Sequence, residues 1–154
     1  MSRQDLVMFV VVMGVSGSGK TTVGEGLGRL LDFAVLDADD LHPPANIAKM
    51  AAGQPLTDDD RQPWLEEVGT RAAALAAAAG GVVVACSALR RAHRDVLRRH
   101  GATRFVHLCG DRATIQGRVM TRKGHYMDAS MHASQVATLE STDAEADVAR
   151  FDIG

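Results

Sequence analysis

One stretch decides the fold: Gly14-Val15-Ser16-Gly17-Ser18-Gly19-Lys20-Thr21, which matches the phosphate-loop pattern G-x-x-x-x-G-K-[ST] at every fixed position. The apolar, valine-rich residues 6–13 before it predict a buried strand, and residues 22–31 after it predict a helix. In such an arrangement the loop amides and the positive end of the helix dipole converge on a phosphate. The glycines could instead only form a turn, but the strand before them and the helix after them favour nucleotide binding.

Specific contacts follow from this pattern. We expect Lys20 to contact the β- and γ-phosphates of ATP and the Thr21 hydroxyl to bind Mg²⁺. The residues expected to bind the ATP phosphates are Gly14, Ser16, Gly17, Ser18, Gly19, Lys20, Thr21, Thr22 and, from later in the chain, Arg118.

The composition is that of one globular domain spanning residues 1–154, without linker or repeat. A net charge of −2 argues against nucleic-acid binding through a general basic field. No segment approaches the roughly 18–20 apolar residues that span a bilayer, so we expect no membrane partner and a cytoplasmic location. The only cysteines, Cys86 and Cys109, lack metal-ligand spacing and are expected to be buried thiols.

Apolar strands alternate with helices along the chain, which predicts an α/β fold. The expected form is a parallel five-stranded sheet flanked by helices, as in phosphate-loop nucleoside and shikimate kinases. The predicted strands are residues 6–13, 33–36, 82–85, 104–108 and 148–153. The predicted helices are residues 22–31, 45–52, 63–79, 90–100, 112–122 and 134–140.

Two carboxylates follow the second predicted strand. Asp37 and Asp39 stand two residues apart, so both point toward the carboxyl edge of the sheet, where α/β proteins bind ligands. The third strand ends in Cys86-Ser87 and lacks the usual metal-associated aspartate, so we expect Asp37 to lie near Mg²⁺. Asp39 would then face the acceptor hydroxyl and orient it. The alternative is that these aspartates only cap the next segment.

Two arginines lie four residues apart near the end of a predicted helix. Arg118 and Arg122 share one helix face, and Gly124 ends the helix. A lid around residues 118–132 would present these arginines to a transferring phosphoryl group. Solvated surface arginines are the alternative.

Several segments together resemble the gluconate kinase (gluconokinase) family, within the shikimate-kinase-like group of small phosphate-loop kinases. The resemblance covers about residues 13–140, and its most specific block is Gly53-Gln54-Pro55-Leu56-Thr57-Asp58-Asp59-Asp60-Arg61-Gln62-Pro63-Trp64-Leu65. The other segments are Met13 to Lys20, Asp37-Ala38-Asp39-Asp40-Leu41-His42-Pro43, Asn46-Ile47-Ala48-Lys49-Met50, Cys86-Ser87-Ala88-Leu89, Arg94-Asp95, Arg122-Lys123-Gly124-His125, Ser134-Gln135 and Leu139-Glu140.

The resemblance implies ATP-dependent phosphorylation of D-gluconate on its terminal hydroxyl, giving 6-phosphogluconate, and a homodimer. It implies catalytic roles for Lys20, for Asp39 as the hydroxyl-orienting group, and for Arg122 as the lid arginine. The substrate pocket would use Asp39, His42, Lys49, Arg61, Ser87, Arg90 and His125.

The chemistry of gluconate supports this assignment. Its carboxylate requires an arginine fork and its hydroxyls require mixed donors and acceptors, and Arg61, His42, Asp39 and Ser87 form such a set. Trp64 could form a wall of the pocket, but a position in the core is favoured. The aspartates at 58–60 are expected to cap the long helix.

The sequence also departs from the family. His93 and Val136 stand where the family has aromatic residues, and His132 where it has leucine, so lid packing is expected to differ. Family members continue past the equivalent of residue 153 into a loop beside the adenine and a final helix. Here the sequence ends at Gly154, so either the protein lacks these elements or this sequence omits them.

Two alternatives remain. One is another small-molecule kinase acting on shikimate or adenylylsulfate, against which His42-Pro43 and the block from Arg61 to Trp64 argue. The other is a nucleotide-binding subunit without catalytic activity, against which Lys20, Asp39 and Arg122 argue.

Overall fold

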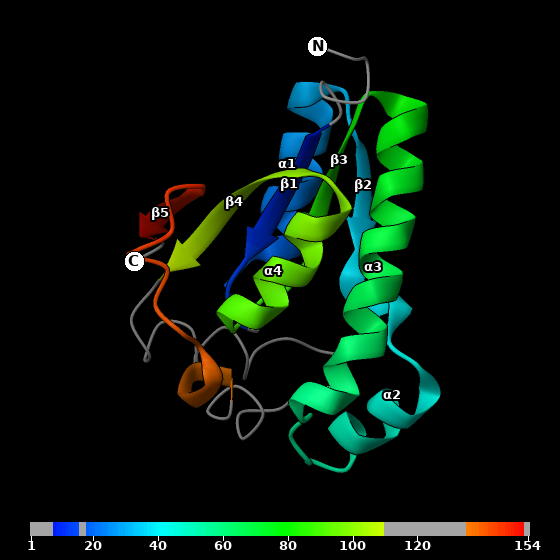
Figure 1. The fold of residues 1–154 in the computed structure, drawn as a ribbon, viewed down its shortest axis with the longest axis vertical. Coiled ribbons are helices and arrows are strands. Elements are labelled where there is room, and N and C mark those ends of the chain that lie inside the picture. The colour runs from blue at the N-terminus through cyan, green and yellow to red at the C-terminus, as the bar shows by residue number, and fades with distance from the viewer. Residues whose placement is uncertain (1–7, 16–17, 110–134, 153–154) are drawn as a thin grey trace.

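The computed structural model describes residues 8–15, 18–109 and 135–152, and its centre is a parallel five-stranded sheet (Figure 1). The strands are β1 (Met8–Met13), β2 (Ala34–Asp37), β3 (Gly81–Ala85), β4 (Ala102–Cys109) and β5 (Val148–Asp152). They lie in the order β2-β3-β1-β4-β5, and every neighbouring pair is parallel. The predicted fold class is confirmed, and each predicted strand is found within one or two residues of its expected bounds where the structure describes it.

Helices cover both faces of the sheet. They are α1 (Lys20–Leu31), α2 (Pro44–Ala51), α3 (Asp58–Ala79) and α4 (Arg91–His100), and a short 3₁₀ helix η2 (Ala38–Leu41) follows β2. Helices α3 and α4 lie on one face of the sheet and α1 on the other (Figure 1). The predicted helix 112–122 lies outside the described residues, and of the predicted helix 134–140 the structure shows one turn at 135–138.

The central strand β1 is buried on both sides, because its side chains alternate between two cores. The core beneath α3 and α4 includes Phe9, Val11, Met13, Trp64, Leu65, Val68, Val82, Val84 and Leu97. The core beneath α1 includes Val10, Val12, Val83 and Leu108, with Val23 and Leu27 of α1 packed against them. This explains why the strand is apolar without alternation.

Two glycines of helix α1 lie against the sheet. A Cβ atom at Gly28 would overlap Cγ2 of Val35 in β2, and Gly24 is buried against β3. The low helix propensity of these residues is therefore offset by the close contact that they permit.

The start of α3 corrects the sequence prediction, which began this helix at residue 63. The helix begins at Asp58, five residues earlier, because Thr57 and Asp60 form a capping box: the Thr57 hydroxyl accepts from the Asp60 amide, and the Asp60 carboxylate accepts from the Thr57 amide. Three aspartates occupy the first turn, where their charges complement the helix dipole. Pro63 is accommodated inside the helix.

An ion-pair network joins α4 to the segment before β5. Arg94 is fully buried, and its guanidinium donates to both carboxylate oxygens of Glu145 at 2.7–2.8 Å and to the carbonyl oxygen of Ala88 at 2.7 Å. Arg98 adds contacts to Glu145 and Asp147 at 2.7 Å. Burial alone would raise the pKa of Glu145, but the hydrogen bonds from Arg94 and Arg98 lower it. The network holds the loop after β3 in place.

Two further observations concern the cysteines and the length of the helices. Cys86 is buried, and burial raises the pKa of its thiol to about 12, but Cys109 is only half-buried because it ends β4 at the edge of the core. Among the residues that the structure describes, no helix has the length and apolar character to cross a membrane.

Candidate active site

The phosphate loop follows β1 at the carboxyl edge of the sheet. Gly14 has a φ of +148°, and a Cβ atom there would lie 2.8 Å from Oγ of Ser18 and 2.9 Å from the carbonyl oxygen of Leu108. Only glycine fits this position without strain. The Gly14 amide donates to the carbonyl oxygen of Ser87, which follows β3, so the loop is tied to the neighbouring strand end.

The two residues expected to contact Mg²⁺ and phosphate lie at the start of α1. The ammonium group of Lys20 donates to the carbonyl oxygen of Val15 at 3.0 Å, within the loop. The Thr21 hydroxyl donates to Oδ2 of Asp37 at 3.1 Å. The structure therefore brings together the hydroxyl and the carboxylate that the sequence predicts for Mg²⁺.

Asp37 also caps the 3₁₀ helix that follows it. Its Oδ1 accepts from the Asp39 amide at 3.0 Å. The capping alternative is thus correct for Asp37, and it does not exclude the metal role because Oδ2 faces Thr21. The cap directs the Asp39 side chain into the adjoining pocket.

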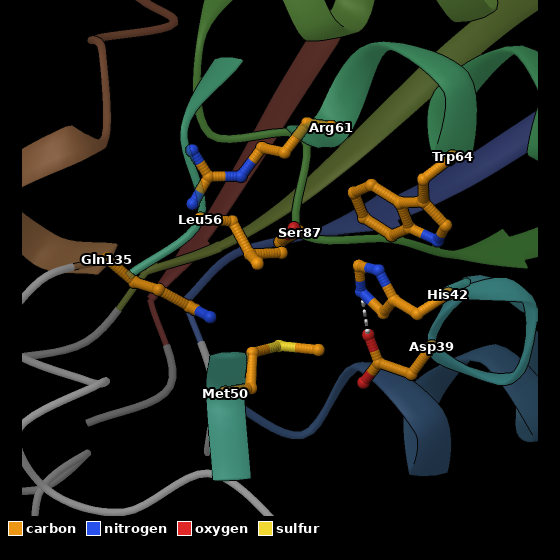
Figure 2. A pocket seen from close by; sticks show the side chains of 8 residues that line it. All are labelled: Asp39, His42, Met50, Leu56, Arg61, Trp64, Ser87 and Gln135. Atoms are coloured by element: carbon orange, nitrogen blue, oxygen red, sulfur yellow. Dashed lines mark ion pairs between the residues drawn. The ribbon is translucent and has the colours of Figure 1, made fainter. Parts of the chain in front are cut away.

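That pocket is small and partly open to solvent. Figure 2 shows its polar residues, which are Asp39, His42, Arg61, Ser87 and Gln135, and its apolar residues, which are Met50, Leu56 and Trp64. Four of the predicted substrate residues, Asp39, His42, Arg61 and Ser87, therefore lie in one pocket. Such a mixture of donors, acceptors and one apolar wall suits a small anion that carries many hydroxyl groups.

His42 is held on three sides. Its ring stacks on Trp64 with the centroids 4.0 Å apart, and its Nδ1 lies 3.2 Å from Nδ2 of Asn46. Its Nε2 lies 3.8 Å from Oδ1 of Asp39 (Figure 2). Burial lowers the pKa of His42 to about 4, helped by the positive charge of Arg61, so the imidazole is neutral at neutral pH.

Trp64 has both of the positions considered for it from the sequence. It is buried in the core, as expected, with its indole nitrogen donating to the carbonyl oxygen of Ala38 at 2.7 Å. However, it also forms a wall of the pocket, since its ring faces His42. Core and pocket share this side chain because α3 passes over the carboxyl end of the sheet.

Arg61 lies at the opposite side of the pocket from Asp39. It is buried, and its Nη1 lies 3.9 Å from Oδ1 of Asp58. Burial lowers the pKa of the guanidinium, which nevertheless stays charged. The Asp58 carboxylate also accepts from His93 at 3.0 Å, and this hydrogen bond lowers the pKa of Asp58.

Two predicted substrate residues are not part of this pocket's lining. Lys49 forms an ion pair of 2.6 Å with Asp60, and Arg90 lies 3.6 Å from Asp58. Gly19 is the N-cap residue of α1, and Thr22 belongs to its first turn. Five other predicted site residues, Ser16, Gly17, Arg118, Arg122 and His125, lie outside the described residues, as do His132 and the lid around residues 118–132.

The sequence reasoning missed Gln135, Met50 and Leu56 as lining residues. Gln135 is buried and belongs to the helical turn 135–138. The sequence did hold a sign of this role for Gln135, because Ser134-Gln135 is one of the segments that resemble the family. No local pattern, however, shows that a single helical turn faces a pocket.

Within the described part of the chain, no cluster of three or more His, Cys, Asp or Glu side chains is arranged to hold a metal ion. Thr21 and Asp37 offer one hydroxyl and one carboxylate, which fits Mg²⁺, because this ion usually keeps several waters and substrate phosphates as ligands.

Comparisons with known proteins place this geometry in context. The profile of a family described as an AAA domain matches residues 9–142. A curated gluconokinase of Gluconobacter oxydans is 47% identical over 133 residues, which span 86% of this chain and 75% of the relative. The thermoresistant gluconokinase of Escherichia coli is 43% identical, with 93% and 83% of the two chains covered.

Solved structures agree. A gluconokinase from Sinorhizobium meliloti superposes with a TM-score of 0.85 at 43% identity, covering 97% of this chain and 84% of that one. An APS kinase from Mycobacterium tuberculosis superposes with a TM-score of 0.68 at 23% identity, a likeness of fold alone.

Proposed function

The chain belongs to the gluconokinase family of phosphate-loop kinases, and we propose that it transfers the γ-phosphoryl group of ATP to the terminal hydroxyl of D-gluconate. The products are 6-phospho-D-gluconate and ADP. One observation carries the assignment to these residues: Asp39, His42 and Arg61 meet in a single pocket whose Ser87 is tied to the phosphate loop.

The substrate is recognised through complementary groups. Arg61 binds the carboxylate of gluconate, because a planar guanidinium matches two carboxylate oxygens and the partly desolvated site strengthens the contact. Ser87, His42 and Gln135 provide hydrogen bonds to hydroxyls, while Trp64 and Met50 pack against the carbon chain. Glucose has no carboxylate for Arg61, so in this pocket it would leave the buried guanidinium with only its 3.9 Å contact to Asp58.

The phosphate loop and α1 hold the other substrate. The loop amides and Lys20 bind the phosphates of ATP, and Lys20 neutralises charge as it develops on the transferring group. Thr21 and Asp37 would hold Mg²⁺, which when bound neutralises the phosphate oxygens. Arg118 and Arg122 from the lid are proposed to add positive charge at the same place.

Asp39 orients the acceptor. The hydroxyl oxygen of gluconate forms a bond to the γ-phosphorus while the bond from that phosphorus to the β–γ bridging oxygen breaks. The proton of the hydroxyl passes to the Asp39 carboxylate late in the transfer. Most of the rate comes from this positioning and from charge neutralisation, and little from the strength of the base.

The test is a coupled ADP-release assay with ATP, Mg²⁺ and one acceptor at a time. We expect turnover with D-gluconate and none above background with shikimate, adenylylsulfate or D-glucose. Preference for shikimate or adenylylsulfate would assign a different kinase, and tight ATP binding without turnover on any acceptor would favour a subunit without catalytic activity. The homodimer and the cytoplasmic location stay predictions.

A further inference from the structure

Asn46 is a buried side chain of α2 that joins two parts of the site. Its amide nitrogen lies 3.1 Å from the backbone carbonyl oxygen of Asp60 and 3.2 Å from Nδ1 of His42. Asn46 is 3% exposed and His42 is 7% exposed, so water does not compete for these contacts. Neither the phosphate-loop chemistry nor the substrate contacts described above use this residue.

These contacts determine where the proton of His42 resides. A backbone carbonyl can only accept, so the NH₂ group of Asn46 must face Asp60. Its second hydrogen then points to Nδ1 of His42, which must accept and therefore carries no proton. Because burial keeps the imidazole neutral, its single proton lies on Nε2.

The protonated nitrogen faces Asp39. The Nε2 atom and Oδ1 of Asp39 are 3.8 Å apart, too far for a good direct hydrogen bond but close enough for one hydroxyl to contact both. Such a hydroxyl would accept from Nε2–H and donate to the carboxylate, which orients both its lone pairs and its proton. Stacking on Trp64 and the nearby charges of Arg61 and Asp37 complete the surroundings of the ring.

We propose that Asn46 is a positioning residue that holds His42 as its Nε2–H tautomer, so that His42 and Asp39 fix the acceptor hydroxyl between one donor and one acceptor. This deepens the proposed function and rests on it for the identity of the hydroxyl. The tautomer itself does not depend on the substrate.

Asn46→Asp tests the idea with nearly the same shape. A carboxylate at this position can only accept, so it draws a proton onto Nδ1 of His42 and leaves Nε2 without one. Two acceptors then face the substrate hydroxyl. Ala48→Asp, which adds the same charge at an exposed position of α2, is the matched control.

The first readout is the tautomer, measured by NMR on protein labelled with ¹⁵N-histidine, with the His42 signals assigned by their loss in His42→Gln. We expect Nε2 protonated and Nδ1 unprotonated in the wild type and in Ala48→Asp, and a proton on Nδ1 in Asn46→Asp. A proton on Nδ1 of the wild-type His42 would overturn the proposal even if no variant were stable. These spectra need no gluconate, so they decide the tautomer even if another acceptor proves to be the substrate.

The second readout is kinetic and uses His42→Leu, whose side chain has no polar atom for Asn46 to orient. Asn46→Asp should lower kcat/KM for gluconate by about 10- to 100-fold, the loss of one or two hydrogen bonds, with KM for ATP unchanged. In the His42→Leu background the same change should cost less than about threefold. Equal losses in both backgrounds would show a merely structural role and contradict the proposal.

Discussion

Replacing Arg94 with methionine removes the central cation of the ion-pair network between α4 and the segment before β5. Methionine has a similar length and suits a buried site, so the change deletes charge and hydrogen bonds with little change in volume. It leaves the buried Glu145 carboxylate with Arg98 as its cation partner in the network and removes the donor to the carbonyl oxygen of Ala88.

The magnitude follows from burial. The side chains of Arg94 and Glu145 are 0% and 3% exposed, so removing Arg94 leaves a buried carboxylate that water cannot solvate and that only Arg98 still contacts within this network. Breaking such a pair costs about 3–5 kcal/mol of unfolding free energy. For a protein of this size, each kcal/mol lowers Tm by about 2–4 °C, so we expect a fall of roughly 6–20 °C.

Arg71→Met is the matched control. Arg71 pairs with Glu67 at 3.0 Å, but the two side chains are 62% and 48% exposed. Such a surface pair contributes about 0–1 kcal/mol, so the same substitution should barely change Tm. A double variant, Arg94→Met with Glu145→Leu, should recover most of the loss, because it removes the buried carboxylate that has lost its main cation partner.

The assay is urea unfolding followed by circular dichroism at pH 7.5, with Tm measured in parallel. A loss below 1 kcal/mol for Arg94→Met, or a loss equal to that of Arg71→Met, would refute the reasoning. The double variant behaving no better than Arg94→Met would show that the Ala88 contact, and not the stranded Glu145, carries the cost.

Two other predictions concern stability. Thr57→Ala removes one half of the capping box with Asp60 and should cost about 1 kcal/mol in urea unfolding, whereas Thr70→Ala, in the exposed middle of the same helix, should change it little. Burial lowers the pKa of His107, which contacts Thr142, to about 4, whereas the pKa of an unfolded histidine is near 6.5. The neutral histidine therefore contributes its full stability above pH 6.5, and this stability is lost as the pH falls toward 4. At pH 4.5 this one histidine should cost about 2 kcal/mol, and His107→Asn should flatten the decline between pH 6.5 and 4.5; an unchanged pH profile would contradict this account.

Local patterns were enough to predict the sheet and the phosphate loop. The valine run before Gly14 forms a strand, and the glycine-rich segment after it forms a helix, as their local patterns predict. Local sequence preference and tertiary structure therefore agree here. Asp37 and Asp39 both lie at the predicted edge, but the strand period does not explain this, because Asp39 belongs to the 3₁₀ helix η2 that Asp37 caps.

Other features depend on contacts distant in sequence. Trp64 lines the pocket because α3 crosses the sheet edge. Gln135 lines the same pocket although it lies more than 70 residues later in the sequence. The ion pair of Lys49 with Asp60 competes with a substrate role, and the sequence offered no sign of it. A proline is typical of the first turn of a helix, but the capping box at Thr57 starts α3 five residues before Pro63.

The central claim is that Asp39 orients the hydroxyl of D-gluconate for phosphoryl transfer from ATP. The most direct measurement is gluconate-dependent ADP release by the wild type and by Asp39→Asn, with ATP binding measured by calorimetry on the same samples. We predict that the wild type phosphorylates gluconate and that Asp39→Asn keeps its ATP affinity while kcat falls by about 10²–10⁴-fold. Turnover of gluconate by Asp39→Asn at the wild-type rate would contradict the account.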